Sequence, residues 1–199
     1  AHPNLPSFPT RRSSDLVNKP AVEWKGKKQS LKDVMIDVVR SGDISLVPER
    51  FDSTYFYWIE NLQDWCISRQ IWWGHRIPVY YRESETKVSL QHLEVADGWE
   101  QDPDTLDTWF SSALWTWSTL VDPEAAADFT LSLEEILESS PEFQKFHPTN
   151  IMETGYDILF FWVARMILMT TYMLQDVPFK TVYLHFLFLT RFFNNLSLS

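Results

Sequence analysis

The sequence predicts an α/β fold built around a parallel β-sheet. Three features near the end of the chain support this prediction: a short strand at 150–154, a long apolar helix at 157–174 and a second strand at 180–184. Gly155 supplies the turn between the first strand and the helix. Because a strand, a helix and a second strand in this order form a βαβ unit, the two strands should run parallel in one sheet.

The elements before this unit follow from capping residues and from hydrophobic spacing. Ser30, followed three residues later by Asp33, predicts the start of a helix, and Gly42 predicts its end near Arg40. Apolar spacing and turn residues predict four further segments: an aromatic-rich helix at 53–62, an extended segment at 78–82, a helix at 109–120 after the acidic turn DPDTLD, and an acidic surface segment at 124–142 with one or two amphipathic turns.

Size and charge limit what this fold can do. The chain has 199 residues, 45% of them apolar and 10 of them tryptophan, which is enough for one domain with a sizeable core. Its net charge of −10 excludes a surface that is basic throughout, so a nucleic-acid contact would have to be local. The compact cationic cluster beside aromatic residues consists of Arg69, His75 and Arg76.

Cysteine usage and the first segment of the chain predict a cytoplasmic location. The single cysteine, Cys66, permits neither an internal disulfide nor a Cys-rich zinc site, so no metal site is predicted. The first thirty residues contain no apolar segment that could serve as a secretory signal. Glycine-rich phosphate loops of the types GxGxxG and GxxxxGK[ST] are absent from the sequence.

The helix at 157–174 is nearly long enough to cross a membrane. Asp157 at its start and Arg165 in its middle would make a membrane-spanning position costly. We therefore expect this helix to be buried against the sheet and the protein to have no membrane partner, and a membrane-anchored protein is the alternative.

Four long blocks of sequence carry a family resemblance: WCISRQIWWGHRIPVYY, LDTWFSSALWTWSTL, HPTNIMETGYDILFFWVARMILMT and VPFKTVYLH. In this order they resemble the catalytic core of the valyl-tRNA synthetases, a family of class I aminoacyl-tRNA synthetases. The resemblance covers about Val17 to His185. Isoleucyl- and leucyl-tRNA synthetases share the general plan and are the alternatives within the class.

The resemblance implies a domain organisation. Residues 17–100 would be a connector from an editing domain that precedes Val17, and residues 101–185 would be the second, C-terminal half of a Rossmann-type catalytic domain. Residues 1–16 contain SFPTRRSSDL, which resembles a translated sequencing adapter, and a disordered tail is the alternative. Residues 186–199 depart from the family pattern and are predicted to be a frameshifted or truncated tail.

The resemblance also implies a reaction. The full-length enzyme would activate valine with ATP and Mg²⁺ to valyl-adenylate and then transfer the valyl group to tRNA(Val), as a monomer. The HIGH and KMSKS motifs that hold the ATP phosphates in this class are absent from the sequence. No catalytic residue is therefore assigned, and the chain alone is expected to be inactive. A non-catalytic tRNA-binding module is the second hypothesis.

Two residues are candidates for binding the adenylate. Asp157 comes just after the carboxyl end of a predicted parallel strand, where such sheets bind nucleotides, and a carboxylate there can accept hydrogen bonds from ribose hydroxyls. Gly155 would let the backbone approach the adenosine, and the resemblance supports both assignments. The alternative for Asp157 is an acid that complements the dipole of the helix.

Three residues are candidates for the valine side-chain pocket. Ile158 and Trp162 are four residues apart, which places them on one face of an α-helix. The resemblance implies that they line the pocket together with Trp109. Without the resemblance, all three would be predicted as core residues.

The block around the paired tryptophans supplies candidates for contact with the tRNA acceptor end. The resemblance places it near the acceptor-end path, and the polar candidates are Arg69, Gln70, His75 and Arg76. The alternative is that the arginines and tryptophans hold the connector together by packing and cation–π contacts. We prefer the packing interpretation for Trp72 and Trp73, and both interpretations stay open for the arginines.

Overall fold

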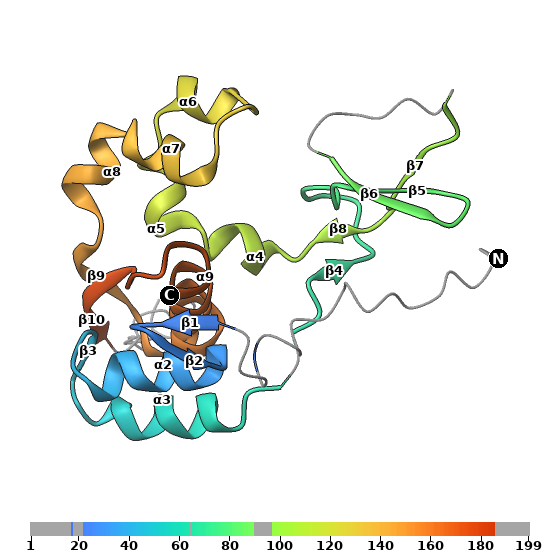
Figure 1. Ribbon diagram of the computed structural model, residues 1–199. Helices are drawn as coiled ribbons and strands as arrows, with labels where there is room; N and C mark the ends of the chain where they lie inside the picture. The colour runs from blue at the N-terminus through green and yellow to red at the C-terminus, as the bar shows by residue number, and fades with distance from the viewer. Residues whose placement is uncertain (1–16, 18–21, 64, 90–96, 186–199) are drawn as a thin grey trace, which may run out of the picture.

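A computed structural model describes residues 17, 22–63, 65–89 and 97–185 (Figure 1). The predictions made for residues 1–16 and 186–199 lie outside the described residues. The main sheet has three parallel strands in the order β3-β10-β9, with the bounds Ser45–Val47, Phe179–His185 and Thr149–Gly155. Val182 of β10 pairs with Leu46 on one side and with Met152 on the other. The predicted parallel sheet is confirmed.

β10 is the central strand because it pairs with β3 on one side and with β9 on the other, and its buried side chains are apolar. Phe179, Val182 and Leu184 are at most 2% exposed. β9, by contrast, exposes Ile151, and among the described residues β9 pairs with β10 alone.

Three helices pack around this sheet. The predicted helix after Ser30 is α2, Leu31–Arg40, and the Ser30 side chain caps it by accepting a hydrogen bond from the Asp33 backbone N–H. α2 packs against α9, Ala164–Leu174, and against α3, Phe51–Glu60. The predicted helix at 53–62 is therefore confirmed, although it begins two residues earlier and ends two residues earlier.

The long helix is buried in part, and its first half differs from the prediction. Tyr156–Ile158 forms a 3₁₀ turn and Leu159–Val163 a π-helical turn, and regular α-helix begins only at α9. Among the described residues, one helical stretch, Tyr156–Leu174, is long and apolar enough to cross a membrane, and about half of it is buried inside the fold. Met166 and Ile167 are completely covered, as the packing prediction requires.

The single helix predicted at 109–120 is wrong, because the structure has two short helices, α4 (Thr108–Ser112) and α5 (Trp115–Ser118). The side chains of Ser111 and Ser112 both donate to the Thr108 carbonyl. The Ser112 carbonyl accepts the indole N–H of Trp162 at 3.1 Å, so a tertiary partner occupies an acceptor that a continuous helix would use.

The acidic segment forms a helical layer on the surface, as predicted, but with three helices rather than one or two turns. They are α6 (Pro123–Ala127), α7 (Leu133–Glu138) and α8 (Pro141–Phe146), and none of them contains a buried residue. Ser132 and Glu135 form a reciprocal capping box at the start of α7.

Several short strands lie outside the main sheet. β1 (Val22–Trp24) pairs with β2 (Lys27–Gln29), and β4 (Ser68–Arg69) pairs with β8 (Thr105–Leu106). β5 (Val79–Arg82) lies between β6 (Glu85–Val88) and β7 (Glu100–Gln101), which confirms the extended segment predicted at 78–82. β4 and β8 connect this second sheet to the helical body (Figure 1).

The hydrophobic core crosses the predicted boundary at residue 100. Val34 and Met35 of α2 belong to the same buried cluster as Met166 of α9 and Val182 of β10. Residues 31–60 therefore pack with residues 149–185, and β4 to β7 form the part that stands apart. The role of residues 17–100 as a connector stays a prediction.

Candidate functional site

The carboxyl edge of the main sheet brings the two predicted adenylate residues together. β9 and β10 end in register at Gly155 and His185. The chain then enters the 3₁₀ turn Tyr156–Ile158, in which Asp157 is exposed. Asp157 therefore lies just past the carboxyl end of β9, at the edge where α/β sheets bind ligands, and its contact with an adenylate stays a prediction.

Gly155 leaves space for the Asp157 side chain and does not supply an unusual backbone conformation. Its φ of −66° and ψ of 142° are accessible to any residue. A Cβ at this position would clash with Oδ1 of Asp157 and would lie 3.9 Å from Cε1 of His185. The missing side chain therefore allows the Asp157 carboxylate to fold back over the end of β9.

An aromatic cavity of about 170 Å³ lies beside this carboxylate. α3 forms one wall and the 3₁₀ and π turns form the other. Phe51 stacks on Tyr156 with ring centroids 5.8 Å apart, and Trp58 packs on Phe160 at 4.6 Å. A cavity with aromatic walls and one free carboxylate can hold a flat or apolar group while accepting hydrogen bonds from hydroxyls. The sequence indicated that α3 is rich in aromatic residues, but not that this face meets Asp157.

The three predicted valine-pocket residues lie close in the fold but have different neighbours. Trp109 stacks on Phe161 at 6.2 Å. Trp162 packs on Trp115 at 5.8 Å and donates its indole N–H to Ser112. Both tryptophans thus contact the junction of the π turn with α4 and α5, and their role in a valine pocket stays a prediction.

Ile158 is half-buried and ends the 3₁₀ turn, whereas Trp162 belongs to the π turn. The expectation that a spacing of four places them on one face of an α-helix is therefore wrong. A π turn closes i to i+5 hydrogen bonds, so its side chains advance around the axis differently from those of an α-helix.

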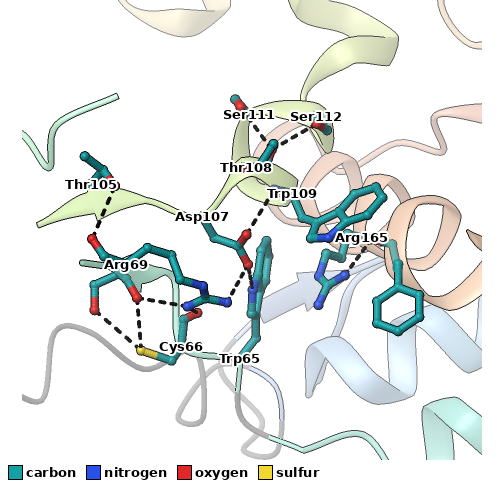
Figure 2. A network of polar contacts seen from close by, with 12 residues as sticks. Trp65, Cys66, Arg69, Thr105, Asp107, Thr108, Trp109, Ser111, Ser112 and Arg165 are labelled. Carbon is teal, nitrogen blue, oxygen red and sulfur yellow. Dashed lines mark hydrogen bonds and ion pairs between the residues drawn. The ribbon is translucent and has the colours of Figure 1, made fainter. Parts of the chain in front are cut away.

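Arg165 is held in an aromatic cage (Figure 2). Its guanidinium lies 4.6 Å from the Trp65 ring and 5.9 Å from the Trp109 ring, and Nη1 donates to the Phe161 carbonyl at 2.6 Å. Burial lowers the pKa of Arg165 below its usual value, and the Asp107 carboxylate opposes that shift. These contacts with aromatic rings and with the Phe161 carbonyl explain how the cation of Arg165 fits into the middle of an apolar helix.

Asp107 connects the cage to Arg69 of β4 (Figure 2). Its Oδ2 accepts the indole N–H of Trp65 at 2.7 Å and forms an ion pair with Arg69 at 2.8 Å. Its Oδ1 accepts the backbone N–H of Trp109, which caps α4. Asp107 is buried, whereas 38% of the Arg69 side chain is exposed.

Three of the four predicted tRNA contacts are engaged within the chain. Besides the pair formed by Arg69, Gln70 donates to Oδ2 of Asp104 at 2.7 Å and Arg76 donates to the Asp102 carbonyl at 3.0 Å. The acidic turn DPDTLD at 102–107, predicted only as a turn, therefore contacts the segment that contains Arg69, Gln70 and Arg76. His75 is exposed, and tRNA binding by these residues stays a prediction.

The packing interpretation of the paired tryptophans is wrong. Trp72 is 93% exposed and Trp73 is 86% exposed. They stand at the tip of a loop whose two sides are fixed to the acidic turn by Gln70 and by the bridge between Arg76 and Thr105. Their ring faces are therefore open to solvent.

Comparisons with known proteins agree on one family. The family described as tRNA synthetases class I (I, L, M and V) matches residues 18–97 and 87–191. A valine--tRNA ligase of Clostridium tetani is 49% identical over 170 residues, covering 82% of this chain and 18% of that protein. A valine--tRNA ligase of Mycobacterium leprae is 41% identical over 204 residues, covering 96% of this chain and 21% of that protein.

Among solved structures, the methionyl-tRNA synthetase of Mycobacterium tuberculosis bound by methionyl-adenylate superposes with a TM-score of 0.49 and 14% identity. The match covers 77% of this chain and 24% of that one. This chain spans about a fifth of the length of the curated relatives it matches.

Proposed function

Because the chain belongs to the class I tRNA synthetases of the I, L, M and V group, we propose that it is part of a valine--tRNA ligase. Its parallel sheet is then the C-terminal half of the Rossmann-type catalytic domain. The valyl type is favoured over the isoleucyl and leucyl types because relatives at 41–49% identity are valine--tRNA ligases.

The observation that carries this proposal is the Asp157 carboxylate, folded over Gly155 at the carboxyl edge beside an aromatic cavity. In the reaction, the valine carboxylate attacks the α-phosphate of ATP. Pyrophosphate leaves and valyl-adenylate forms; the valyl group then passes to a hydroxyl of the terminal adenosine of tRNA(Val), and AMP leaves.

In this scheme Asp157 positions the substrate and performs no chemistry. Its oxygens accept hydrogen bonds from the ribose hydroxyls and so orient the α-phosphate for attack. Trp109, Ile158 and Trp162 contact the valine side chain, and Arg69, Gln70, His75 and Arg76 contact the acceptor end.

Mg²⁺ would neutralise charge on the ATP phosphates. Among the described residues, no group of three or more His, Cys, Asp and Glu side chains could hold a metal ion. No step is therefore assigned to a metal held by this chain. With the HIGH and KMSKS motifs absent from the sequence, the chain alone should not exchange pyrophosphate into ATP.

A chimaera tests the proposal. In the Clostridium tetani enzyme, the matching segment is replaced by residues 22–185 of this chain, and exchange of labelled pyrophosphate into ATP is measured with valine, isoleucine and leucine. Exchange that depends on valine is expected. A folded chimaera that responds only to isoleucine or leucine would assign the segment to that type, and one that responds to none of the three would refute a part in amino-acid activation.

The alternative of a tRNA-binding module makes a different prediction. The exposed Trp72 and Trp73 favour it, because base stacking uses open aromatic faces. The 199-residue chain alone would then bind a tRNA acceptor stem with a Kd that Trp72→Ala weakens. Under the leading proposal, binding by the chain alone is not required.

A further inference from the structure

A second and larger cavity is lined by residues of α3, of α9 and of the segment that carries Trp65 and Cys66. Its volume is about 470 Å³, which is in the range of sites that hold small molecules. Trp58 and Phe160 line this cavity and also the cavity beside Asp157, so the two cavities share a wall. Asp157 is not among the described residues that line the larger cavity. The larger cavity is therefore separate from the proposed adenylate site.

One edge of the Arg165 guanidinium is available to a ligand in this cavity. Arg165 lines the cavity, and its Nη1 donates to the Phe161 carbonyl. Its Nε and Nη2 make no hydrogen bond or ion pair with the described residues, and neither atom is buried from solvent. These two groups form one side of the planar guanidinium, and their parallel N–H bonds fit two oxygens of a phosphate or a carboxylate.

Aromatic rings hold this pair of donors in a fixed orientation. The guanidinium carbon of Arg165 lies 4.6 Å from the centre of the Trp65 ring and 5.9 Å from that of Trp109, and Figure 2 shows the two rings beside it. The rings of Phe160 and Phe161 lie at 6.0 Å and 5.7 Å. A side chain that is already ordered loses less conformational entropy when a ligand binds, so an anion gains more from this arginine than from a mobile one.

Positive charge is in excess around the cavity. Arg69 also lines it, and the Asp107 carboxylate forms an ion pair with Arg69 but none with Arg165. Asp107 therefore compensates one of the two guanidinium groups. No aspartate or glutamate is among the described residues that line the cavity. A cation would be repelled here, whereas an anion would supply the missing charge.

The walls of the cavity favour a flat ring as the other part of the ligand. Trp65 and Phe160 place aromatic side chains in its interior, and Tyr57 and Trp58 of α3 line its open side. Tyr57 is 66% exposed, so its ring can pack on a ligand without a change in the core. Planar rings stack on aromatic side chains of this kind.

Two exposed side-chain amides add hydrogen-bond acceptors. Nδ2 of Asn61 donates to the Tyr57 carbonyl at 2.7 Å, and Nε2 of Gln63 donates to the Asn61 carbonyl at 3.1 Å. Both amides line the cavity, and their oxygens accept no hydrogen bond from the described residues. These oxygens can accept N–H groups of a ligand. An anionic group, a flat ring and an amino group on that ring together describe a nucleotide.

We propose that this cavity binds a nucleotide, whose phosphate accepts hydrogen bonds from Nε and Nη2 of Arg165 and whose base packs on Tyr57 and Trp58. The same chemistry is supplied by a free nucleotide and by one nucleotide of a single-stranded RNA. The proposal is independent of the role in amino-acid activation, because Gly155 and Asp157 take no part in it.

The single cysteine of the chain provides a measurement confined to this cavity. Cys66 lines the cavity and is exposed, and hydrogen bonds with Ser68 lower the pKa of its thiol. A thiolate reacts with N-ethylmaleimide, so a nucleotide in the cavity should slow the alkylation of Cys66 in the 199-residue chain. The dependence of this rate on nucleotide concentration gives the Kd.

AMP and a tetra-adenylate RNA are the two probes. Saturable protection of Cys66 by either one supports the proposal. Protection by AMP alone identifies a free nucleotide as the ligand, and protection by the RNA alone identifies a strand. Absence of saturable protection by both would overturn the proposal. Inorganic phosphate lacks the ring and should protect only at much higher concentration; equal protection by phosphate and AMP would overturn the assignment to a nucleotide.

Matched arginine variants locate the phosphate contact. Arg165→Gln should raise the Kd about tenfold or more, because hydrogen bonds to a charged group are lost. Arg165→Lys keeps the charge without the paired donors and should also weaken binding. Arg82 likewise lies over a tryptophan ring, at 4.5 Å from Trp99, but does not line the cavity, so Arg82→Gln should leave the Kd nearly unchanged. Equal effects of Arg165→Gln and Arg82→Gln would overturn the site.

A variant at the open side of the cavity tests the base contact without changing the cage around Arg165. Tyr57→Ala should raise the Kd about fivefold or more, because a stacking contact is lost. Tyr172→Ala changes an exposed tyrosine of α9 that does not line the cavity, and it should leave the Kd nearly unchanged. Melting curves check that each variant is folded. An unchanged Kd in folded Tyr57→Ala would overturn the proposed base contact.

Discussion

A single carboxylate at the carboxyl edge of the sheet carries the nucleotide assignment. Asp157→Ala in the chimaera should raise the KM for ATP about fivefold to thirtyfold, since one or two hydrogen bonds are lost at about 1 kcal/mol each, while the KM for valine should change little. Glu153→Ala removes an exposed carboxylate from β9, the strand that precedes Asp157, and serves as the control. Equal changes in KM for both variants would count against a ribose contact.

The pocket residues separate a substrate role from a packing role. If Ile158 and Trp162 contact valine, Ile158→Ala and Trp162→Ala should raise the KM for valine and improve the relative rate with isoleucine in the chimaera. If they only pack, each should lower stability by about 2–5 kcal/mol and leave the ratio of the two rates unchanged. Met166→Ala, in the completely buried part of α9, provides the pure packing control. An unchanged ratio in both pocket variants would remove these residues from the substrate site.

His147 makes the stability of the fold depend on pH. Its pKa is lowered by burial, so the folded state binds a proton less readily than the unfolded chain does. Its contribution to stability is therefore complete above the unfolded pKa of about 6.5 and is lost as the pH falls toward the folded pKa. Melting temperatures of the wild type should fall more steeply below pH 6.5 than those of His147→Phe.

The control for this pH effect is His75→Gln, which changes an exposed histidine. Its melting temperatures should follow the wild-type profile. Identical profiles for His147→Phe and the wild type would show that another group causes the acid sensitivity.

At the scale of elements, Asp107 joins the start of α4 to Trp65 and Arg69, which lie 42 and 38 residues away in the sequence. Asp107→Asn keeps a cap for α4 but removes the charge that faces Arg69, and it should destabilise the chain by roughly 1–3 kcal/mol, less than for a fully buried pair because Arg69 is partly exposed. Urea unfolding followed by tryptophan fluorescence measures this loss. Asp122→Asn, at the exposed cap of α6, should cost less than about 1 kcal/mol. A loss no larger than that of the control would contradict the proposed connection.

Elements formed by interactions between residues close in the sequence were predicted better than elements that depend on residues far away in the sequence. α2 was predicted well because its cap and its apolar spacing are local. β3 was missed because three residues contain too little periodicity, and its strand conformation depends on pairing with β10. The break between α4 and α5 was missed for the same reason, because Trp162 reaches Ser112 from fifty residues away.

The candidate site divides in the same way. The position of Asp157 followed from the strand that precedes it, whereas the aromatic wall of α3 depends on how α3 packs against the π turn. Ile158 and Trp162 were predicted on one face because a regular α-helix was assumed, whereas the structure has a 3₁₀ turn followed by a π turn. The exposed Trp72 and Trp73 contradict the usual rule that large aromatic residues are buried, and such exceptions occur at surfaces that contact a partner.

At the scale of the whole molecule, the chain has its core and its polar connections in different places. The core joins α2, α3 and α9 to the sheet, whereas an ion pair and a hydrogen bond hold Arg69 and Gln70 to the acidic turn at 102–107. Salt should therefore loosen the contact between β4 and the acidic turn before it affects the core.

The central position of β10 also sets an order of events during synthesis. Among the described strands, β3 and β9 both pair with β10, which follows both of them in the chain. Residues 45–47 must wait for residues 179–185 before they gain a partner, and translation at about 5–20 residues per second makes that interval several seconds long. During this interval the apolar faces of α2 and α3 have no sheet to cover them. The nascent chain therefore offers a binding target to chaperones until β10 has been synthesised and released from the ribosome.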